Sequence, residues 1–95
     1  MMDRMDLLTD AQRRQLSADH PEWTVTPDSM SRTWTFTDFV AAMGFVTRVA
    51  ILAEKAFHHP DVDIRWNRVT LTLSTHEAGG LTSYDADLAA TLDAL

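Results

Sequence analysis

The order of apolar and polar residues along the chain predicts helices near both ends and one long helix in the middle. Near the start, Thr9 with Gln12 three positions on has the pattern of a capping box, in which each side chain bonds the other residue's backbone N–H. This pattern predicts a first helix over about Asp10–Leu16 or one residue further. Because proline disfavours a helical conformation of the residue before it, Pro21 sets the limit of this helix at His20.

Strict alternation of apolar and polar residues, which is typical of strands, occurs in four segments that form two hairpins. The first pair is Trp23–Thr26 and Arg32–Phe36, and the second pair is Val62–Trp66 and Val69–Ser74. The two strands of the first pair are joined by Pro27-Asp28-Ser29, which are residue types that favour turns. Asn67-Arg68 joins the second pair, where asparagine tolerates the left-handed backbone of a tight turn better than arginine does.

A long helix is predicted between the two hairpins. Thr37-Asp38 can cap its start, and Pro60 sets its end at Phe57 or His58. A run of about 19 residues is roughly 28 Å long, enough to cross a small sheet. Apolar residues spaced by three and four positions share one face of this helix, and they are Phe39, Met43, Val46, Ala50, Ala53 and Phe57. Further apolar residues widen the arc, and they are Val40, Phe45, Val49 and Leu52.

The last helix opens with a second capping-box pattern, formed by Thr82 and Asp85. It extends to about residue 94 through Leu88, Leu92 and Leu95. The resulting order is α-β-β-α-β-β-α. Two hairpins that each have one apolar face, with three amphipathic helices, predict an α+β fold with a four-stranded antiparallel sheet and the helices on one face.

Length and composition place the chain among small globular domains. Its 95 residues correspond to one domain. Met1–Leu8 carries three charged residues between short apolar ones, unlike a signal peptide, and is predicted to be a flexible tail. No 18 apolar residues run together, so no transmembrane helix is expected.

Charge and cysteine content exclude several classes of function. Eight Lys plus Arg against fourteen Asp plus Glu give a net charge of −6, which argues against nucleic acids and membrane surfaces as partners. Without cysteine there is no disulfide framework, thiolate nucleophile or Cys-based metal site. This fits a reducing compartment, and we expect a cytoplasmic protein.

Three of the four histidines fall near the ends of predicted elements. His58 and His59 end the long helix, and His76 follows the last strand. Imidazoles exchange protons near neutral pH, so this set indicates acid/base chemistry. Solvated loop ends are an equally good interpretation of the same residues. A metal site that adds Asp61 or Glu77 is less favoured, because adjacent histidines diverge and no H-E-x-x-H motif occurs.

An ordered set of motifs resembles the pterin-4a-carbinolamine dehydratase family. The segments that carry the resemblance are Glu54–Asp61 with its His-His-Pro, Trp66–Val69 with its Asn-Arg, and Leu73–Thr82 with its Ser-Thr-His-Glu-Ala-Gly-Gly-Leu-Thr. Residues of the long helix and of the first hairpin are similar as well, and they are Phe39, Met43–Ala50, Ala53–Lys55, Trp23 and Trp34–Phe36. The resemblance thus covers about residues 9 to 93. Phe57 departs from it, since many members carry a polar or acidic residue there.

The resemblance implies a dehydratase that takes the 4a-hydroxytetrahydropterin made by aromatic amino acid hydroxylases and expels water to give quinonoid dihydropterin. Such an enzyme, in the recycling of tetrahydrobiopterin or a related pterin, uses neither a metal nor an organic cofactor and forms homodimers or homotetramers. The resemblance also implies an aromatic amino acid hydroxylase as the metabolic partner of this protein. The implied catalytic set is His58, His59 and His76, and the implied pterin pocket contains Pro60, Thr75, Glu77 and Ala78.

Glu54 and Asp85 are further substrate-site candidates, and each has an alternative role. Asp85 is also the third residue of a capping box. Glu54 could orient a histidine one turn later or be a solvated helix residue. His20 is expected to be structural or solvated, while Trp23 and Trp66 are more typical of a core or an interface than of substrate stacking.

A non-catalytic binding module is the competing class, because members of the resembled family also serve as dimerisation partners of a transcription factor. The acidic charge allows protein partners, whereas the three histidines favour an enzyme. Independently, one layer of helices covers only one face of a sheet in a chain this small. We therefore expect a homodimer or homotetramer, formed through an open sheet edge or a helix face that carries Val40 and Leu52.

Overall fold

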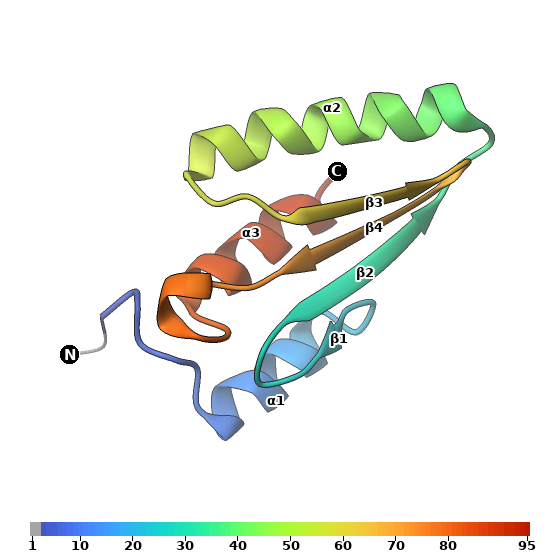
Figure 1. Cartoon of the computed structure of the whole chain (residues 1–95). Helices are drawn as coiled ribbons and strands as arrows, with labels where there is room; N and C mark the ends of the chain where they lie inside the picture. The colour runs from blue at the N-terminus through green and yellow to red at the C-terminus, as the bar shows by residue number, and fades with distance from the viewer. Residues whose placement is uncertain (1–2) are drawn as a thin grey trace.

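Three helices and four strands follow one another in the predicted order in the computed structural model, which describes residues 3–95 (Figure 1). The elements are α1 Asp10–Asp19, β1 Thr24–Val25, β2 Met30–Thr35, α2 Phe39–Ala56, β3 Asp61–Arg65, β4 Arg68–Leu73, a 3₁₀ turn at His76–Ala78, and α3 Ser83–Asp93. Both predicted capping boxes are present, at Thr9 and Gln12 and at Thr82 and Asp85. Within these residues, no helix combines the length and apolar character that crossing a bilayer requires.

The four strands form one antiparallel sheet in the order β1-β2-β4-β3. The central strand β4 alternates buried Val69, Leu71 and Leu73 with half-buried Thr70 and Thr72. Side chains of α1, α2 and α3 all join the cluster that the buried residues of β4 form. The helices therefore cover the same face of the sheet, and the predicted α+β architecture is confirmed.

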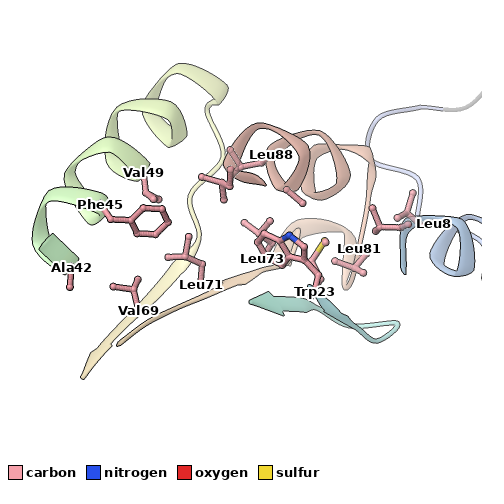
Figure 2. Close-up of a cluster of buried hydrophobic side chains, with 14 residues drawn as sticks. Leu8, Trp23, Ala42, Phe45, Val49, Val69, Leu71, Leu73, Leu81 and Leu88 are labelled. Carbon is pink, nitrogen blue, oxygen red and sulfur yellow. The ribbon is translucent and has the colours of Figure 1, made fainter. Parts of the chain in front are cut away.

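The core lies where α2 and α3 meet β4 (Figure 2). The buried side chains of α2 are Ala42, Phe45, Val49 and Ala53. Of the stripe that the sequence predicts, Ala53 is buried and Val46 packs against the core, whereas Phe39, Met43 and Phe57 are exposed. Because α2 is apolar almost all round, periodicity did not distinguish its two apolar faces. The sheet packs on the face that offers two alanines, since small side chains allow the helix to approach closely.

The β3–β4 turn lies one residue earlier than the sequence predicts. Arg65 pairs with Arg68, so the turn residues are Trp66 and Asn67 rather than Asn67 and Arg68. Trp66 takes the left-handed conformation, with φ 50°. Asn67 donates from Nδ2 to the carbonyl oxygen of Phe36 at 2.8 Å and accepts from the Phe36 N–H at 2.8 Å. These two bonds to the end of β2 fix the register.

Residues 3–8, which belong to the predicted flexible tail, contact the rest of the chain. Leu8 is buried in the core, and its N–H donates to the carbonyl oxygen of Leu81 at 2.8 Å. Arg4 pairs with Asp87 at 3.0 Å and lies over the ring of Tyr84. Residues 3–8 therefore make specific contacts with the loop before α3 and with α3 itself. Residues 1 and 2, also part of the predicted tail, lie outside the described residues.

The end of α3 is tied to the rest of the fold through Asp93. Its carboxylate accepts from Trp23 Nε1 at 2.7 Å and Arg32 at 2.6 Å, and it lies 2.6 Å from His20 Nδ1. His20 and Trp23 thus have structural roles, as expected. Burial, the largest single influence, raises the pKa of Asp93, but the hydrogen bonds from Trp23, His20 and Arg32 outweigh it and hold that pKa below its ordinary 3.8.

Replacing Asp93 with asparagine is expected to lower the free energy of unfolding by about 1–3 kcal/mol near neutral pH. A carboxylate with a lowered folded-state pKa contributes stability above its unfolded pKa, and that contribution disappears as pH falls through the folded value. Urea unfolding of both proteins should therefore show a difference at pH 5 that shrinks below pH 3.8. A difference that is constant down to pH 2 would contradict the role of this charge.

Candidate active site

The three clustered histidines meet at one end of the sheet. In the antiparallel β3–β4 pair, Asp61 at the start of β3 lies opposite Thr72 near the end of β4. The residues just before β3 and just after β4 are therefore neighbours in space. This brings His58 and His59, which follow α2, next to His76, which opens the 3₁₀ turn.

Two hollows of about 240 Å³ each lie at this place. One is lined by Met5, Phe57, His58, Thr75, Glu77 and Tyr84, and the other by Phe57, His58, His59, Ser74, His76 and Glu77. Since Phe57, His58 and Glu77 belong to both, we treat the two hollows as one site and call it the histidine cleft. All three predicted catalytic histidines line it.

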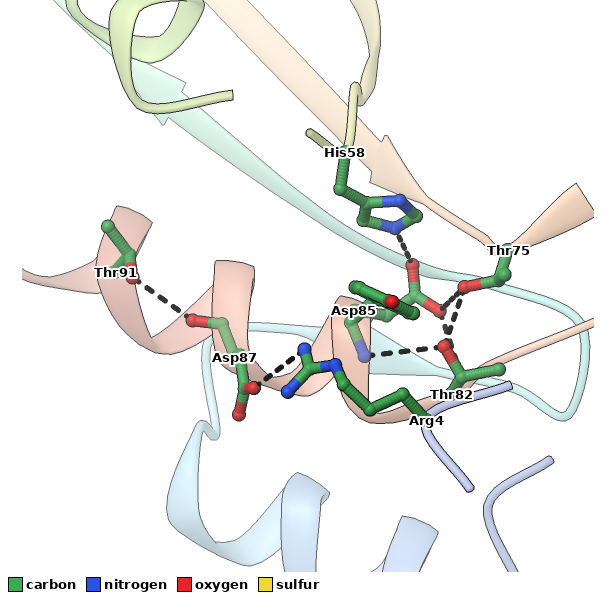
Figure 3. A network of polar contacts seen from close by, with 8 residues as sticks. Arg4, His58, Thr75, Thr82, Asp85, Asp87 and Thr91 are labelled. Atoms are coloured by element: carbon green, nitrogen blue, oxygen red, sulfur yellow. Dashed lines mark hydrogen bonds and ion pairs between the residues drawn. The ribbon is translucent and has the colours of Figure 1, made fainter. Parts of the chain in front are cut away.

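His58 is the most firmly held of the three histidines. Its side chain is 13% exposed, and its Nε2 lies 2.6 Å from Oδ1 of Asp85 in α3, which is fully buried. The other oxygen of Asp85 accepts from Thr75 Oγ1 at 2.8 Å and from the Thr82 N–H at 2.9 Å. Figure 3 shows His58 on one side of the Asp85 carboxylate and both threonines on the other.

This network determines which nitrogen of His58 carries the hydrogen. An ionised carboxylate only accepts hydrogen bonds, so Nε2 carries the hydrogen that it donates to Asp85. Nδ1 is then the nitrogen left for exchange with a ligand. Of the two roles that the sequence left open for Asp85, the capping box is present. Asp85 is fully buried and lines neither hollow, so its second role is to hold His58 and not to contact a substrate directly.

The loop after β4 is shaped by its two glycines. Gly79 has φ 81° and ends the 3₁₀ turn, a conformation that residues with a Cβ rarely adopt. A Cβ on Gly80 would come within 2.7 Å of the Pro27 carbonyl oxygen. Gly80 also pairs with Thr75, so the two glycines fold the loop back and fix the residue that supports Asp85.

His59 and His76 are more accessible than His58. His59 Nε2 lies 2.5 Å from Oε1 of Glu54, although both side chains are more than half exposed. Glu54 is thus close enough to orient His59, but such a pair in solvent contributes little stability. His76 is exposed on the wall of the cleft. The cleft therefore combines one half-buried, firmly held imidazole with two that are exposed to water.

The other predicted pocket residues separate into two groups. Glu77 and Thr75 both line the cleft, where Glu77 is exposed and Thr75 is buried with its hydroxyl bound to Asp85. Pro60 and Ala78 are half-buried and are not lining residues of either hollow. Four residues that line the cleft were not assigned to the site from the sequence, and they are Phe57, Tyr84, Met5 and Ser74. Of these, only Phe57 could have been found from the sequence, because it directly precedes His58.

Adjacent His58 and His59 bond carboxylates on different helices, Asp85 of α3 and Glu54 of α2. The two imidazoles are thus held apart, as the sequence suggested. Within residues 3–95, no three His, Asp or Glu side chains come together in a way that could hold a metal ion.

Comparison with known proteins gives a consistent result. A family model described as pterin 4 alpha carbinolamine dehydratase matches residues 6–95. A Nocardia farcinica protein named as a candidate pterin-4-alpha-carbinolamine dehydratase is 53% identical over 90 residues, which are 95% of each chain. A protein of the same name from Chloroflexus aurantiacus is 49% identical over 89 residues, 94% of this chain and 96% of the other.

A crystal structure from Brucella melitensis shares the fold. That protein, described as a transcriptional coactivator/pterin dehydratase, has a TM-score of 0.87 and 32% identity over 94% of this chain and 97% of its own. The family match includes every residue of the histidine cleft except Met5. The chain therefore belongs to the pterin 4 alpha carbinolamine dehydratase family.

Proposed function

We propose that this protein is an enzyme that dehydrates 4a-hydroxytetrahydropterin to quinonoid dihydropterin, with His58, His59 and His76 as its acid/base residues. The observation that carries the proposal is the 2.6 Å contact of His58 with buried Asp85, on the wall of a cleft that also contains the other two histidines. A buried carboxylate that fixes the hydrogen of an imidazole is a recurrent device of acid/base catalysis.

The reaction requires two proton transfers and no change of oxidation state. One imidazolium donates a proton to the 4a-hydroxyl, and the C4a–O bond breaks to release water. A second imidazole takes the proton from N5, whose electron pair forms the C4a=N5 double bond. Each transfer needs a group that titrates near neutral pH, which histidine provides.

The remaining pocket candidates have roles that their positions support. Glu77 belongs to both hollows, where a carboxylate could accept hydrogen bonds from the N–H groups on the pyrimidine edge of a pterin. Thr75 and Asp85 act on the substrate through His58. Pro60 and Ala78 would shape the loops on either side of the cleft. The substrate would come from an aromatic amino acid hydroxylase, in recycling of tetrahydrobiopterin or a related pterin.

Turnover of synthetic 4a-hydroxytetrahydropterin by the purified protein tests this proposal. We expect saturable acceleration over the uncatalysed dehydration, followed by absorbance, and the same rate after exhaustive chelation. The histidines supply the proton transfers, so no metal is required. Activity that chelation removes and zinc or iron restores would contradict the metal-free mechanism. No acceleration with any pterin would contradict the function.

A binding module is the second candidate, and the outer face of α2 favours it. Val40, Ile51 and Phe39 are 79%, 62% and 51% exposed on this helix, and Met43 is 39% exposed. Exposed apolar side chains gathered on one element are typical of a protein–protein contact. The Brucella relative's description as a coactivator is consistent with such a role. Catalysis and docking would use different surfaces.

The same face leads us to expect a homodimer or homotetramer. Of the two residues that the sequence assigned to an oligomer face, Val40 is exposed, whereas Leu52 packs against the core. Light scattering at micromolar concentration should give a mass that is a multiple of 10.7 kDa. Val40→Glu or Ile51→Glu should lower it by placing a charge in the contact. A 10.7 kDa species at every dilution would contradict this expectation.

A further inference from the structure

Phe57 stands in a conformation that phenylalanine seldom adopts. It caps the C-terminus of α2 with φ 52° and ψ 36°, and its N–H donates to the carbonyl oxygens of Ala53 and Glu54. Glycine is the usual residue at such a left-handed cap, because a Cβ costs roughly 1–2 kcal/mol there. A bulky residue in the left-handed conformation is an outlier, and such outliers are often found at functional sites.

Packing of the Phe57 side chain does not compensate for this unfavourable backbone conformation. The side chain of Phe57 is 89% exposed, the highest value among the large apolar residues that the structure describes. An exposed ring gains almost nothing from burial, which is the usual source of stability from phenylalanine. Both the backbone and the side chain of Phe57 are therefore unfavourable for the folded chain alone.

The position of Phe57 suggests what it does. It directly precedes His58 and lines both hollows of the histidine cleft, as does Glu77. Tyr84 also lines one hollow, but the Arg4 guanidinium lies over its ring at 4.1 Å, and the His58 ring lies 5.8 Å from it. Phe57 offers the cleft an aromatic ring whose surface is open to solvent.

We propose that Phe57 is a substrate-stacking residue, whose ring lies against the flat fused-ring system of the pterin and holds it beside His58. This inference rests on the proposed function and deepens it. An exposed aromatic ring beside a few convergent polar groups is the composition of small-molecule sites. Planar heterocycles such as nucleobases gain substantially from stacking on aromatic side chains, largely independently of their substituents.

Binding of a fluorescent pterin, oxidised biopterin, to the purified protein tests the inference. Phe57→Leu keeps an apolar side chain without a π face and is expected to raise the Kd about 5- to 50-fold. Phe57→Tyr should retain wild-type affinity. With the 4a-hydroxy substrate, Phe57→Leu should raise KM by a similar factor and change kcat much less, since the histidines are intact.

Phe57→Gly separates stacking from a structural role. Glycine adopts the left-handed conformation freely, so this variant should keep or raise the Tm while it weakens biopterin binding at least as much as Phe57→Leu. If Phe57 served the fold, the Tm would fall instead.

Trp66 provides a matched control. It is also aromatic, 68% exposed and left-handed, with φ 50°, but it lies in the β3–β4 turn at the opposite end of the sheet from the cleft (Figure 1). Trp66→Leu and Trp66→Gly should leave biopterin binding unchanged. If Phe57→Leu and Phe57→Gly bind biopterin as tightly as the wild type does, the stacking inference is overturned while the proposed function stands. A wild-type protein that binds and dehydrates no pterin would overturn the proposed function as well.

Discussion

Replacing His76 or His59 with alanine is expected to slow dehydration of the 4a-hydroxypterin by about 10- to 10,000-fold, the range for a positioned acid or base. His76 and His59 are exposed, so their removal leaves no buried group without a partner and the fold should be retained. His58→Ala should slow the reaction within the same range. Steady-state rates at saturating substrate, with circular dichroism to confirm folding, would measure these effects.

His20→Ala is the control for these variants. His20 bonds Asp93 at the other end of α3 from Asp85, so its loss should affect stability and not the rate of dehydration. If the variants of His58, His59 and His76 all keep wild-type rates while binding a pterin analogue normally, the histidines are not the catalysts. The binding-module function would then be favoured.

Replacing Asp85 is expected to have two separable effects, because its two oxygens have different partners. Asp85→Ala removes the bonds from Thr75 and from the Thr82 N–H, and it leaves that buried N–H without its acceptor, while the Thr75 hydroxyl keeps only its contact with the Thr82 hydroxyl. The expected loss is about 2–4 kcal/mol of unfolding free energy. For a domain of this size, each kcal/mol corresponds to roughly 4–8 °C in Tm, so calorimetry should show a large decrease.

Asp85→Asn tests the role of the carboxylate as a positioning residue for His58. Asparagine can still accept at the cap through its oxygen, but it then presents N–H donors to His58 Nε2. His58 would have to accept at Nε2 and carry its hydrogen on Nδ1, the reverse of the wild-type arrangement. The rate should fall by up to about 10,000-fold, as when a catalytic histidine is held in the wrong tautomer, with a smaller loss of stability than in Asp85→Ala.

Two measurements distinguish this role from a purely structural one. Nitrogen NMR of the imidazoles should show the hydrogen of His58 moving from Nε2 to Nδ1 in Asp85→Asn. Asp87→Asn is the matched control, because Asp87 is on the same helix but is exposed and pairs with Arg4. Its rate and its His58 signals should match the wild type. An Asp85→Asn variant with an unchanged rate and tautomer would rule out positioning by Asp85.

Much of this protein is determined by relations between neighbours in the chain. The capping residues Thr9 and Thr82 and the order of helices and strands could be predicted from the sequence, because capping and alternation act over a few residues. The fold class followed from that order. That His58 and His59 lie near His76 could be expected only because all three histidines are at the ends of predicted elements and because the chain resembles a known family.

Other features were decided by the tertiary structure, because they depend on partners distant in the chain. The sheet selected the face of α2 with Ala42, Phe45 and Val49, although the sequence also offered an apolar stripe through Phe39, Met43 and Phe57. Asp85 reaches His58 across 27 positions of sequence, and no local pattern encodes that contact. The exposure of Phe57 likewise appears only when the surroundings of α2 are known. Local patterns specify which residues are apolar or capped, whereas burial and long-range hydrogen bonds depend on which surfaces the folded chain brings together.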